Sequence, residues 1–214
     1  YNAVVPKSFV FVGTENKRFN CGNVDLQQDW SIEVWVKFDG LGVGVEGMIG
    51  HGITSNNNGL HLQVFNSGAQ TRFGFHSDDV DVTFGSALVN DTWYHLVYTY
   101  SNTNPYTKQV YLNGALEDSG AGSAYARATD ELSIGSTYSP KTNGNEMDGE
   151  IAAVRVYTKV LSASEITTNY NVGYQASASG GVSGITTIAT DSNGRKHFTG
   201  QFTNYTIDNR AISA

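Results

Sequence analysis

The sequence is poor in charged residues, in cysteine and in long apolar runs, and each shortage excludes a class of protein. Charged side chains make up 15% of the 214 residues, and acidic residues outnumber basic ones by 20 to 13, so the formal net charge is −7. Nucleic-acid binding requires a clustered basic surface, and the basic residues here are scattered. The sequence therefore predicts no nucleic-acid partner.

Cys21 is the one cysteine, so an internal disulfide is excluded, and we interpret it as a small buried apolar residue. No apolar run approaches the roughly 20 residues that cross a bilayer as a helix, so no membrane span is predicted. Low charge combined with much Asn, Ser, Thr, Gly and Tyr is typical of secreted or virion-surface β proteins. We therefore expect an extracellular or virion-surface location.

The chain contains many short β-branched and aromatic segments separated by turn residues, which indicates an all-β fold. Trp30–Phe38 alternates, and its apolar face should be core while Trp35 lies on the opposite face, as a covered second layer or a ligand platform. Asn113-Gly114 is the strongest hairpin signal in the chain. We expect residues 78–81 to form an acidic loop and Gly120–Arg127 to form a loop of small residues.

The segment from Glu146 to Tyr170 combines a strand with the one clear helix signal in the sequence. Ser162 is a natural N-cap, and Glu165 follows at capping-box spacing. Leu161 and Ile166 stand at the two positions of a hydrophobic staple. Many strands and one capped helix predict a two-sheet antiparallel jelly-roll sandwich with one short helix.

Four stretches together resemble the laminin-G-like domains of the concanavalin A-like lectin/glucanase superfamily. They are residues 31–38 (SIEVWVKF), 92–100 (TWYHLVYTY), 110–114 (VYLNG) and the closing 154–166 (VRVYTKVLSASEI). Their order and spacing match that family over roughly residues 7 to 171, a normal size for one sandwich domain. The resemblance implies the jelly-roll fold, and it does not fix the function, because this fold hosts many activities.

The domain boundaries are predicted from composition. Residues 1–174 form the laminin-G-like domain, and the Ala, Ser and Gly of 175–184 predict a flexible linker. Residues 185–214 predict a C-terminal β-hairpin extension, which is an assembly arm or the start of a further domain. A lone hairpin is marginally stable in water, so it should pack on the sandwich or on a neighbouring subunit.

Glycan-binding sites on such folds use loops at one end of the sandwich, with an aromatic ring stacked on the sugar and amides that grip its hydroxyls. The ligand-binding candidates are loop residues of these types: Asn56, Asn57, Asn58, Tyr125 and Tyr138.

Calcium is the cofactor that the sequence suggests. Asp78, Asp79 and Asp81 supply hard oxygens that could hold Ca²⁺ with backbone carbonyls. The alternative is a solvated acidic loop. The family resemblance implies a different calcium site, but Val12 and Ala152 replace the aspartates that would form it.

Glu146, Asp148 and Glu150 spell ExDxE, the spacing of the catalytic carboxylates in retaining β-glucanases of this superfamily. On a strand, these three side chains would face the same way. Gly149 interrupts the triplet and no Trp lies near it, unlike in those enzymes. We therefore expect no catalytic residues.

The preferred reading is a non-catalytic extracellular or surface recognition module whose partner is a glycan or a surface protein. The alternative is a structural surface subunit of a virion or filament, such as a decoration, fibre or capsid protein, that assembles as a homo-oligomer or with particle neighbours through the C-terminal arm. A β-glucanase is the third reading.

Overall fold

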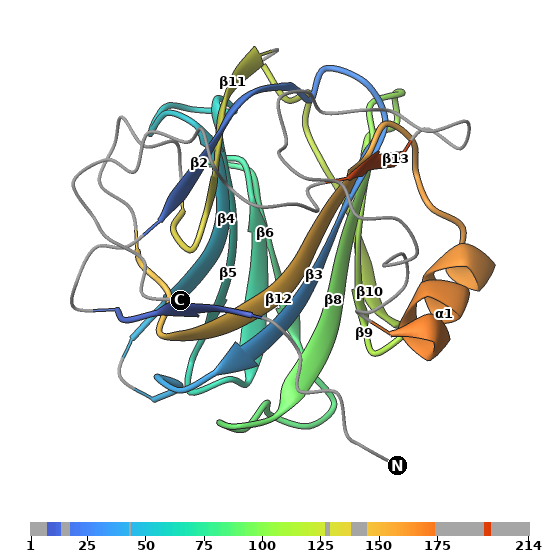
Figure 1. The fold of residues 1–214 in the computed structure, drawn as a ribbon. Coiled ribbons are helices and arrows are strands. Elements are labelled where there is room, and N and C mark those ends of the chain that lie inside the picture. The colour runs from blue at the N-terminus through green and yellow to red at the C-terminus, as the bar shows by residue number, and fades with distance from the viewer. Residues whose placement is uncertain are drawn as a thin grey trace.

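The computed structural model describes residues 8–13, 18–42, 44–126, 129–137 and 145–173, and the backbone of 195–197. These residues form two antiparallel sheets that pack face to face, with one helix on the outside (Figure 1). The prediction of a two-sheet jelly-roll sandwich with one short helix is confirmed. None of the described helical residues forms a segment long and apolar enough to cross a membrane.

The first sheet joins the beginning, middle and end of the sandwich domain. Its strands, in spatial order, are β1 (Phe9–Phe11), β12 (Gly149–Tyr157), β3 (Trp30–Phe38), β8 (Trp93–Ser101), β9 (Thr107–Leu112) and β10 (Ala115–Ala121). The short strand β13 (Arg195–His197) also pairs with β12. Strand β8 lies inside this sheet, as its two apolar faces predict.

The second sheet contains the strands that carry the candidate site. Its spatial order is β2 (Phe19–Asp25), β11 (Thr129–Ile134), β4 (Glu46–Gly52), β5 (Gly59–Phe65), β6 (Gln70–Gly74) and β7 (Asp79–Thr83). Strand β7 corrects our expectation of a loop at residues 78–81, since only Asp78 precedes the strand. Strand β10 likewise extends to Ala121, where we expected a loop from Gly120.

The core lies between the inward faces of the two sheets. Ile32 and Val36 of β3 and Leu62 and Val64 of β5 are fully buried, and Cys21 is 6% exposed, as predicted for a small apolar residue. Burying one such aliphatic side chain contributes about 1.5–3 kcal/mol. The alternation of β3 therefore fixes which of its faces meets the second sheet.

Helix α1 (Ala163–Val172) covers part of the outer face of the first sheet. Ser162 caps it, with the reciprocal Glu165 hydrogen bonds of a capping box, as predicted. Leu161 and Ile166 are buried in one small cluster with side chains of the sheet. Trp35 is 7% exposed beneath the helix and stacks on Tyr170 at a centroid distance of 5.9 Å, so it is a covered second layer.

A polar cluster is enclosed between α1 and the sheet, and we call it the sealed network. It consists of Glu33, His95, Arg155, Tyr157 and Asn169. Glu33 receives hydrogen bonds from the Tyr157 hydroxyl at 2.7 Å and the Asn169 amide at 2.9 Å, and it pairs with Arg155. His95 Nε2 lies 3.2 Å from Glu33 Oε1, and both side chains are 0% exposed.

Burial alone would raise the pKa of Glu33. The neighbouring His95 and the charge of Arg155 outweigh burial and lower this pKa to about 2. Glu33 is therefore ionised at neutral pH and paired with Arg155, and its hydrogen bonds from Tyr157 of the sheet and Asn169 of the helix fasten α1 to the sheet.

The predicted linker at 175–184 lies outside the described residues, as does the predicted hairpin at 185–214 apart from β13. Strand β13 runs antiparallel to β12, with Arg195 opposite Tyr157 and His197 opposite Arg155. The described part of the C-terminal region thus adds a strand to the first sheet.

Candidate functional site

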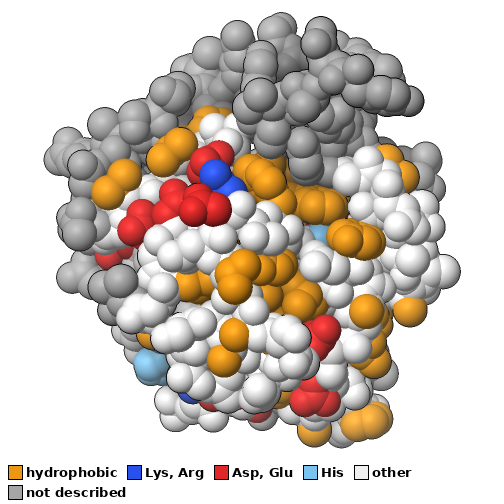
Figure 2. Space-filling model, turned by 90° about the horizontal axis from the view of Figure 1, so that it is seen from below, with side chains coloured by type: hydrophobic (Ala, Val, Ile, Leu, Met, Phe, Trp, Pro, Cys, Tyr) orange, Lys and Arg blue, Asp and Glu red, His pale blue; other side chains and the backbone are white. Residues whose placement is uncertain are grey.

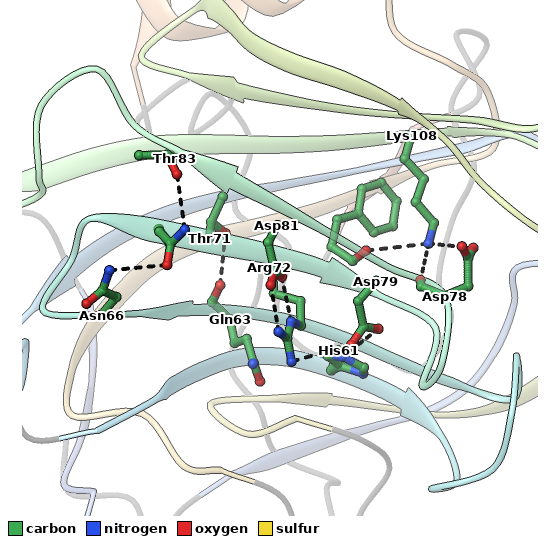
Figure 3. A network of polar contacts seen from close by, with 12 residues as sticks. His61, Gln63, Asn66, Thr71, Arg72, Asp78, Asp79, Asp81, Thr83 and Lys108 are labelled. Atoms are coloured by element: carbon green, nitrogen blue, oxygen red, sulfur yellow. Dashed lines mark hydrogen bonds and ion pairs between the residues drawn. The ribbon is translucent and has the colours of Figure 1, made fainter.

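The outer face of β5, β6 and β7 carries three rows of side chains, because pairing in register places alternate residues of neighbouring strands side by side. One row is His61, Gly74 and Asp79; the next is Gln63, Arg72 and Asp81; the third is Phe65, Gln70 and Thr83. We call the polar members of these rows the polar array (Figure 3). The intervening residues, such as Leu62 and Phe73, point into the core.

Arg72 is at the centre of the polar array. Its Nε and Nη2 atoms donate to the two carboxylate oxygens of Asp81, each at 2.6 Å, and its Nη1 lies 3.4 Å from Asp79 (Figure 3). The three side chains are 27–36% exposed, so solvent reaches the group. This is a planar, preorganised set of polar atoms that is partly exposed on β6 and β7, whereas His61 and Gln63 of β5 are buried, at 3% and 6% exposure.

His61 and Gly74 shape one end of the polar array. His61 Nε2 lies 3.2 Å from Asp79, and the imidazole occupies the space above Gly74. A Cβ atom on Gly74 would lie 2.0 Å from His61 Nε2, so only glycine lets the ring reach the carboxylate. Partial burial raises the pKa of Asp79, but the hydrogen bond and charge of His61, followed by Arg72, lower it overall.

The other end of the polar array is built from neutral groups and an aromatic ring. The Gln70 amide donates to the Thr83 hydroxyl at 3.0 Å, and the Asn66 amide donates to Gln70 at 3.2 Å. The guanidinium carbon of Arg72 lies 5.3 Å from the centre of the half-buried Phe65 ring. Hydrogen-bonding groups and an apolar surface therefore lie together.

A buried lysine fixes the turn that precedes β7. Lys108 Nζ donates to the Asp78 carboxylate at 2.8 Å and lies 3.9 Å from the centre of the Phe75 ring. Burial lowers the pKa of Lys108, partly offset by Asp78. The same carboxylate accepts from the Ser123 backbone amide at 2.7 Å. Asp78 therefore holds two loops together and faces no open site.

These contacts correct the calcium prediction. Asp78 pairs with Lys108, while Asp79 and Asp81 pair with Arg72, so basic side chains hold all three carboxylates. Among the residues that the structure describes, no three His, Cys, Asp or Glu side chains form a group that could hold a metal ion. Asp79 and Asp81 point outward because the segment is a strand.

The predicted glycan loop lies beside the end of the polar array. The Asn57 backbone amide donates to the His76 backbone carbonyl at 3.1 Å, and the Ala126 backbone amide donates to the Asn57 backbone carbonyl at 2.8 Å. Asn56 is exposed, while Asn57 and Asn58 are half-buried. Three loops therefore meet here, and the asparagine loop continues directly into β5.

The two predicted tyrosines have different outcomes. Tyr125 is 3% exposed, and its hydroxyl lies 2.8 Å from His51 Nδ1 and donates to the His51 carbonyl at 3.1 Å. It is a core residue that ties the loop to β4, so its ring cannot stack on a ligand, and that prediction is wrong. Tyr138 lies outside the described residues.

The ExDxE residues lie at the opposite end of the sandwich from the asparagine loop, and they do not share one strand face. Strand β12 begins only at Gly149, whose φ of 143° requires glycine, so Glu146 and Asp148 precede the strand. Glu150 pairs with Lys37 at 2.7 Å. The expectation of three aligned carboxylates is therefore corrected. Figure 2 views the molecule from below. On one side of the surface seen there, acidic side chains gather beside basic ones.

Asp148 instead adjoins Glu46, whose carboxylate accepts from the Asp148 backbone amide at 2.6 Å. Glu46 is 5% exposed. Burial, with smaller contributions from the Asp148 and Asp39 charges, raises the pKa of Glu46 to about 7.

Sequence reasoning missed most of the polar array, although one signal was present. Asp79 and Asp81 are two residues apart, which places both on one face of a strand. Reading 78–81 as a loop hid that spacing. The partnership with Arg72 depends on strand register, which the sequence does not show.

The chain was compared with known proteins. The model of the concanavalin A-like lectin/glucanases superfamily matches residues 13–167. A search of the curated proteins finds none that matches.

Similar solved structures share the fold at low sequence identity. A heptameric SAP-like pentraxin from Limulus polyphemus has a TM-score of 0.60 and 15% identity, over 75% of this chain and 80% of the pentraxin. Domain 4 of an extracellular arabinanase from Geobacillus stearothermophilus, in complex with arabinotriose, has a TM-score of 0.58 and 20% identity, over 78% of each chain. The CBM40 of a Ruminococcus gnavus sialidase, bound to α2,3-sialyllactose, has a TM-score of 0.55 and 17% identity, over 77% of this chain and 97% of the CBM40.

The family model covers more than two thirds of the residues and extends from the turn after β1 into helix α1, and the two-sheet sandwich is the fold of the similar structures. The chain belongs to the concanavalin A-like lectin/glucanase superfamily, as a laminin-G-like domain.

Proposed function

We propose that this protein is a non-catalytic glycan-recognition module, extracellular or surface-located, and that the polar array is its binding site. The observation that carries the proposal is the planar Arg72–Asp81 pair, about a third exposed, flanked by Asp79 and set beside the Phe65 ring. Sugars are bound by a few fixed polar groups together with an apolar surface. The fold neighbours that hold arabinotriose and sialyllactose support this choice of ligand.

The asparagine loop extends the proposed site. Asn56 is exposed, and the loop leads into β5 two residues before His61. A sugar chain that lies along the polar array would reach the loop at this end. In this arrangement, the array supplies most of the affinity and the loop contacts a further sugar unit.

A glycan array followed by calorimetry tests the proposal. The Arg72→Gln and Gln70→Ala variants should each weaken binding by about 10-fold or more. Arg72→Gln removes the ion pairs that hold Asp79 and Asp81 in position, and Gln70→Ala removes neutral hydrogen-bonding groups. Asn56→Ala should have a smaller effect. Binding should survive EDTA, because basic side chains already hold the carboxylates of the array. Wild-type protein that binds no glycan on a broad array would refute the proposal.

One observation favours a second candidate function, a structural surface subunit of a virion or filament. Strand β13 adds to the edge of β12, so the C-terminal region can pair with a sheet edge. The same strand from another copy could occupy that edge and link subunits. Deleting residues 175–214 should then abolish oligomerisation, measured by light scattering, and leave the sandwich folded. A truncated protein that still assembles would remove this candidate.

A further inference from the structure

The charges of the polar array restrict the glycans that it can bind. Arg72 is the only arginine or lysine in the three rows, and two carboxylates, Asp79 and Asp81, lie against it. The guanidinium charge is therefore compensated twice within the protein. The array has no excess positive charge to attract a carboxylated or sulfated sugar, and the whole chain carries a net charge of −7.

Hydrogen-bond geometry leads to the same restriction. Nε and Nη2 of Arg72 donate to Asp81, and Nη1 faces Asp79, so each nitrogen already lies against a protein carboxylate. An acidic sugar is held best by a bidentate pair with a free guanidinium edge. A ligand carboxylate would have to displace Asp81 and would meet the repulsion of both aspartates.

Neutral sugar hydroxyl groups, in contrast, can bind to the polar array without displacing Asp79 or Asp81. An ionised carboxylate has about four acceptor sites, and Arg72 uses only part of those on Asp79 and Asp81. Both side chains are about a third exposed, so their remaining lone pairs can accept from sugar hydroxyls. Gln70 and Thr83 add neutral donors and acceptors in the next row.

We infer that the polar array, taken as the glycan site proposed above, selects neutral sugars and discriminates against carboxylated or sulfated ones. The selectivity comes from Asp79 and Asp81, which occupy the one guanidinium that could hold an acid group.

Paired neutral and acidic probes built on the same sugar backbone test this inference. Suitable pairs are lactose and lactose 3′-sulfate, methyl-esterified and free polygalacturonate, and desulfated and sulfated carrageenan oligosaccharides. Wild-type protein should bind the neutral member of a recognised pair at least about 10-fold more tightly, because an acidic ligand must break the Arg72 pair. Its affinity for the neutral member should change little between low and high salt.

Asp81→Asn tests the cause of the selectivity. It removes one carboxylate from Arg72 and should shift the acidic-to-neutral affinity ratio by about 10-fold toward the acidic probe. Asp118→Asn is the matched control: it makes the same change in net charge on the exposed edge strand β10, and it should leave the ratio unchanged. Asp79→Asn provides a second variant if Asp81→Asn lowers the melting temperature strongly.

The outcomes separate this inference from the proposed function. Tight binding of an acidic probe by wild-type protein, or equal ratios in Asp81→Asn and Asp118→Asn, would overturn the neutral selectivity and leave glycan recognition standing. Failure to bind any glycan would remove the proposed function and this inference together. Neutral preference in the wild type with a shifted ratio in Asp81→Asn would support both.

Discussion

The two sheets each carry a carboxylate, arginine and histidine network on their outer faces, and the two networks differ in their access to solvent. In the sealed network, Glu33 and His95 are 0% exposed beneath helix α1. In the polar array, the side chains of Arg72 and Asp81 are 31% and 36% exposed. Similar residue types therefore serve different purposes, because burial decides whether a polar group stabilises the fold or is available to a ligand.

The contributions of the two networks to stability follow from the same difference in solvent access. Removing one member of a buried pair leaves an uncompensated charge in a low-dielectric interior, whereas an exposed pair is screened by water. The sealed network should therefore dominate stability, and the polar array should dominate binding. The four changes below test that division.

Glu33→Gln should produce the largest effect. It leaves the Arg155 guanidinium, which is 8% exposed, without its carboxylate partner, and should lower the free energy of unfolding by about 3–5 kcal/mol. Urea denaturation measures this loss. Asp118→Asn on β10 is the control and should have little effect. A loss no larger than that of the control would show that the sealed network is not stabilising.

The pH dependence of stability should also show the contribution of the Glu33 carboxylate. The folded-state pKa of Glu33 is about 2, below the ordinary value of 4.5, so its contribution is present above pH 4.5 and is lost as the pH falls toward 2. The stability difference between wild type and Glu33→Gln should shrink by about 3 kcal/mol between pH 5 and pH 2. Denaturation at several pH values measures it, and a constant difference would contradict the assignment.

Two changes separate the core beneath the first sheet from the helix that covers it. Val156→Ala deletes buried methyl groups of a side chain 1% exposed in the core and should cost on the order of 2 kcal/mol. Ser162→Ala removes the N-cap of α1 and should cost about 1 kcal/mol. Chemical denaturation gives the order. A larger loss for Ser162→Ala would show that the helix cover matters more than the strand it lies on.

Arg72→Gln should have the smallest effect on stability. Its ion pairs are about a third exposed, and such pairs contribute less than about 1 kcal/mol. Glycan affinity measured in parallel should fall by about 10-fold or more, since Asp79 and Asp81 lose the guanidinium that holds them in position for the sugar hydroxyls. A stability loss comparable to that of Glu33→Gln would erase the contrast between the two networks.

Local patterns predicted a large part of the fold. The alternation of β3, the Ser162–Glu165 capping box and the hairpin at Asn113-Gly114 each depend on residues close together in the chain, and the structure confirms all three. The acidic segment 78–81 was mistaken for a loop, because its charges mask strand β7, whose inward-facing Val82 is buried.

The candidate site was predicted much less well than the fold. Tyr125 was taken for a surface ring because it lies in a loop of small residues, yet it fills a gap between His51 and Phe75. The aspartates were taken for metal ligands because their hard oxygens suit Ca²⁺, and the sequence does not show that Arg72 and Lys108 lie against them. Their pairing is visible only when β5, β6, β7 and β9 are assembled.

The sequence by itself determined the all-β class, the capped helix and the superfamily, because periodicity, capping and family motifs are short-range properties of the chain. Only the tertiary structure decided which polar residues are enclosed and which are open. Register places Arg72 between Asp79 and Asp81, and helix α1 covers Glu33. The first depends on the register of the β6–β7 pair, where Arg72 and Asp81 are 9 residues apart, and the second on residues as far apart as Glu33 and Asn169, which are separated by 136. Burial and electrostatic pairing are properties of that assembly.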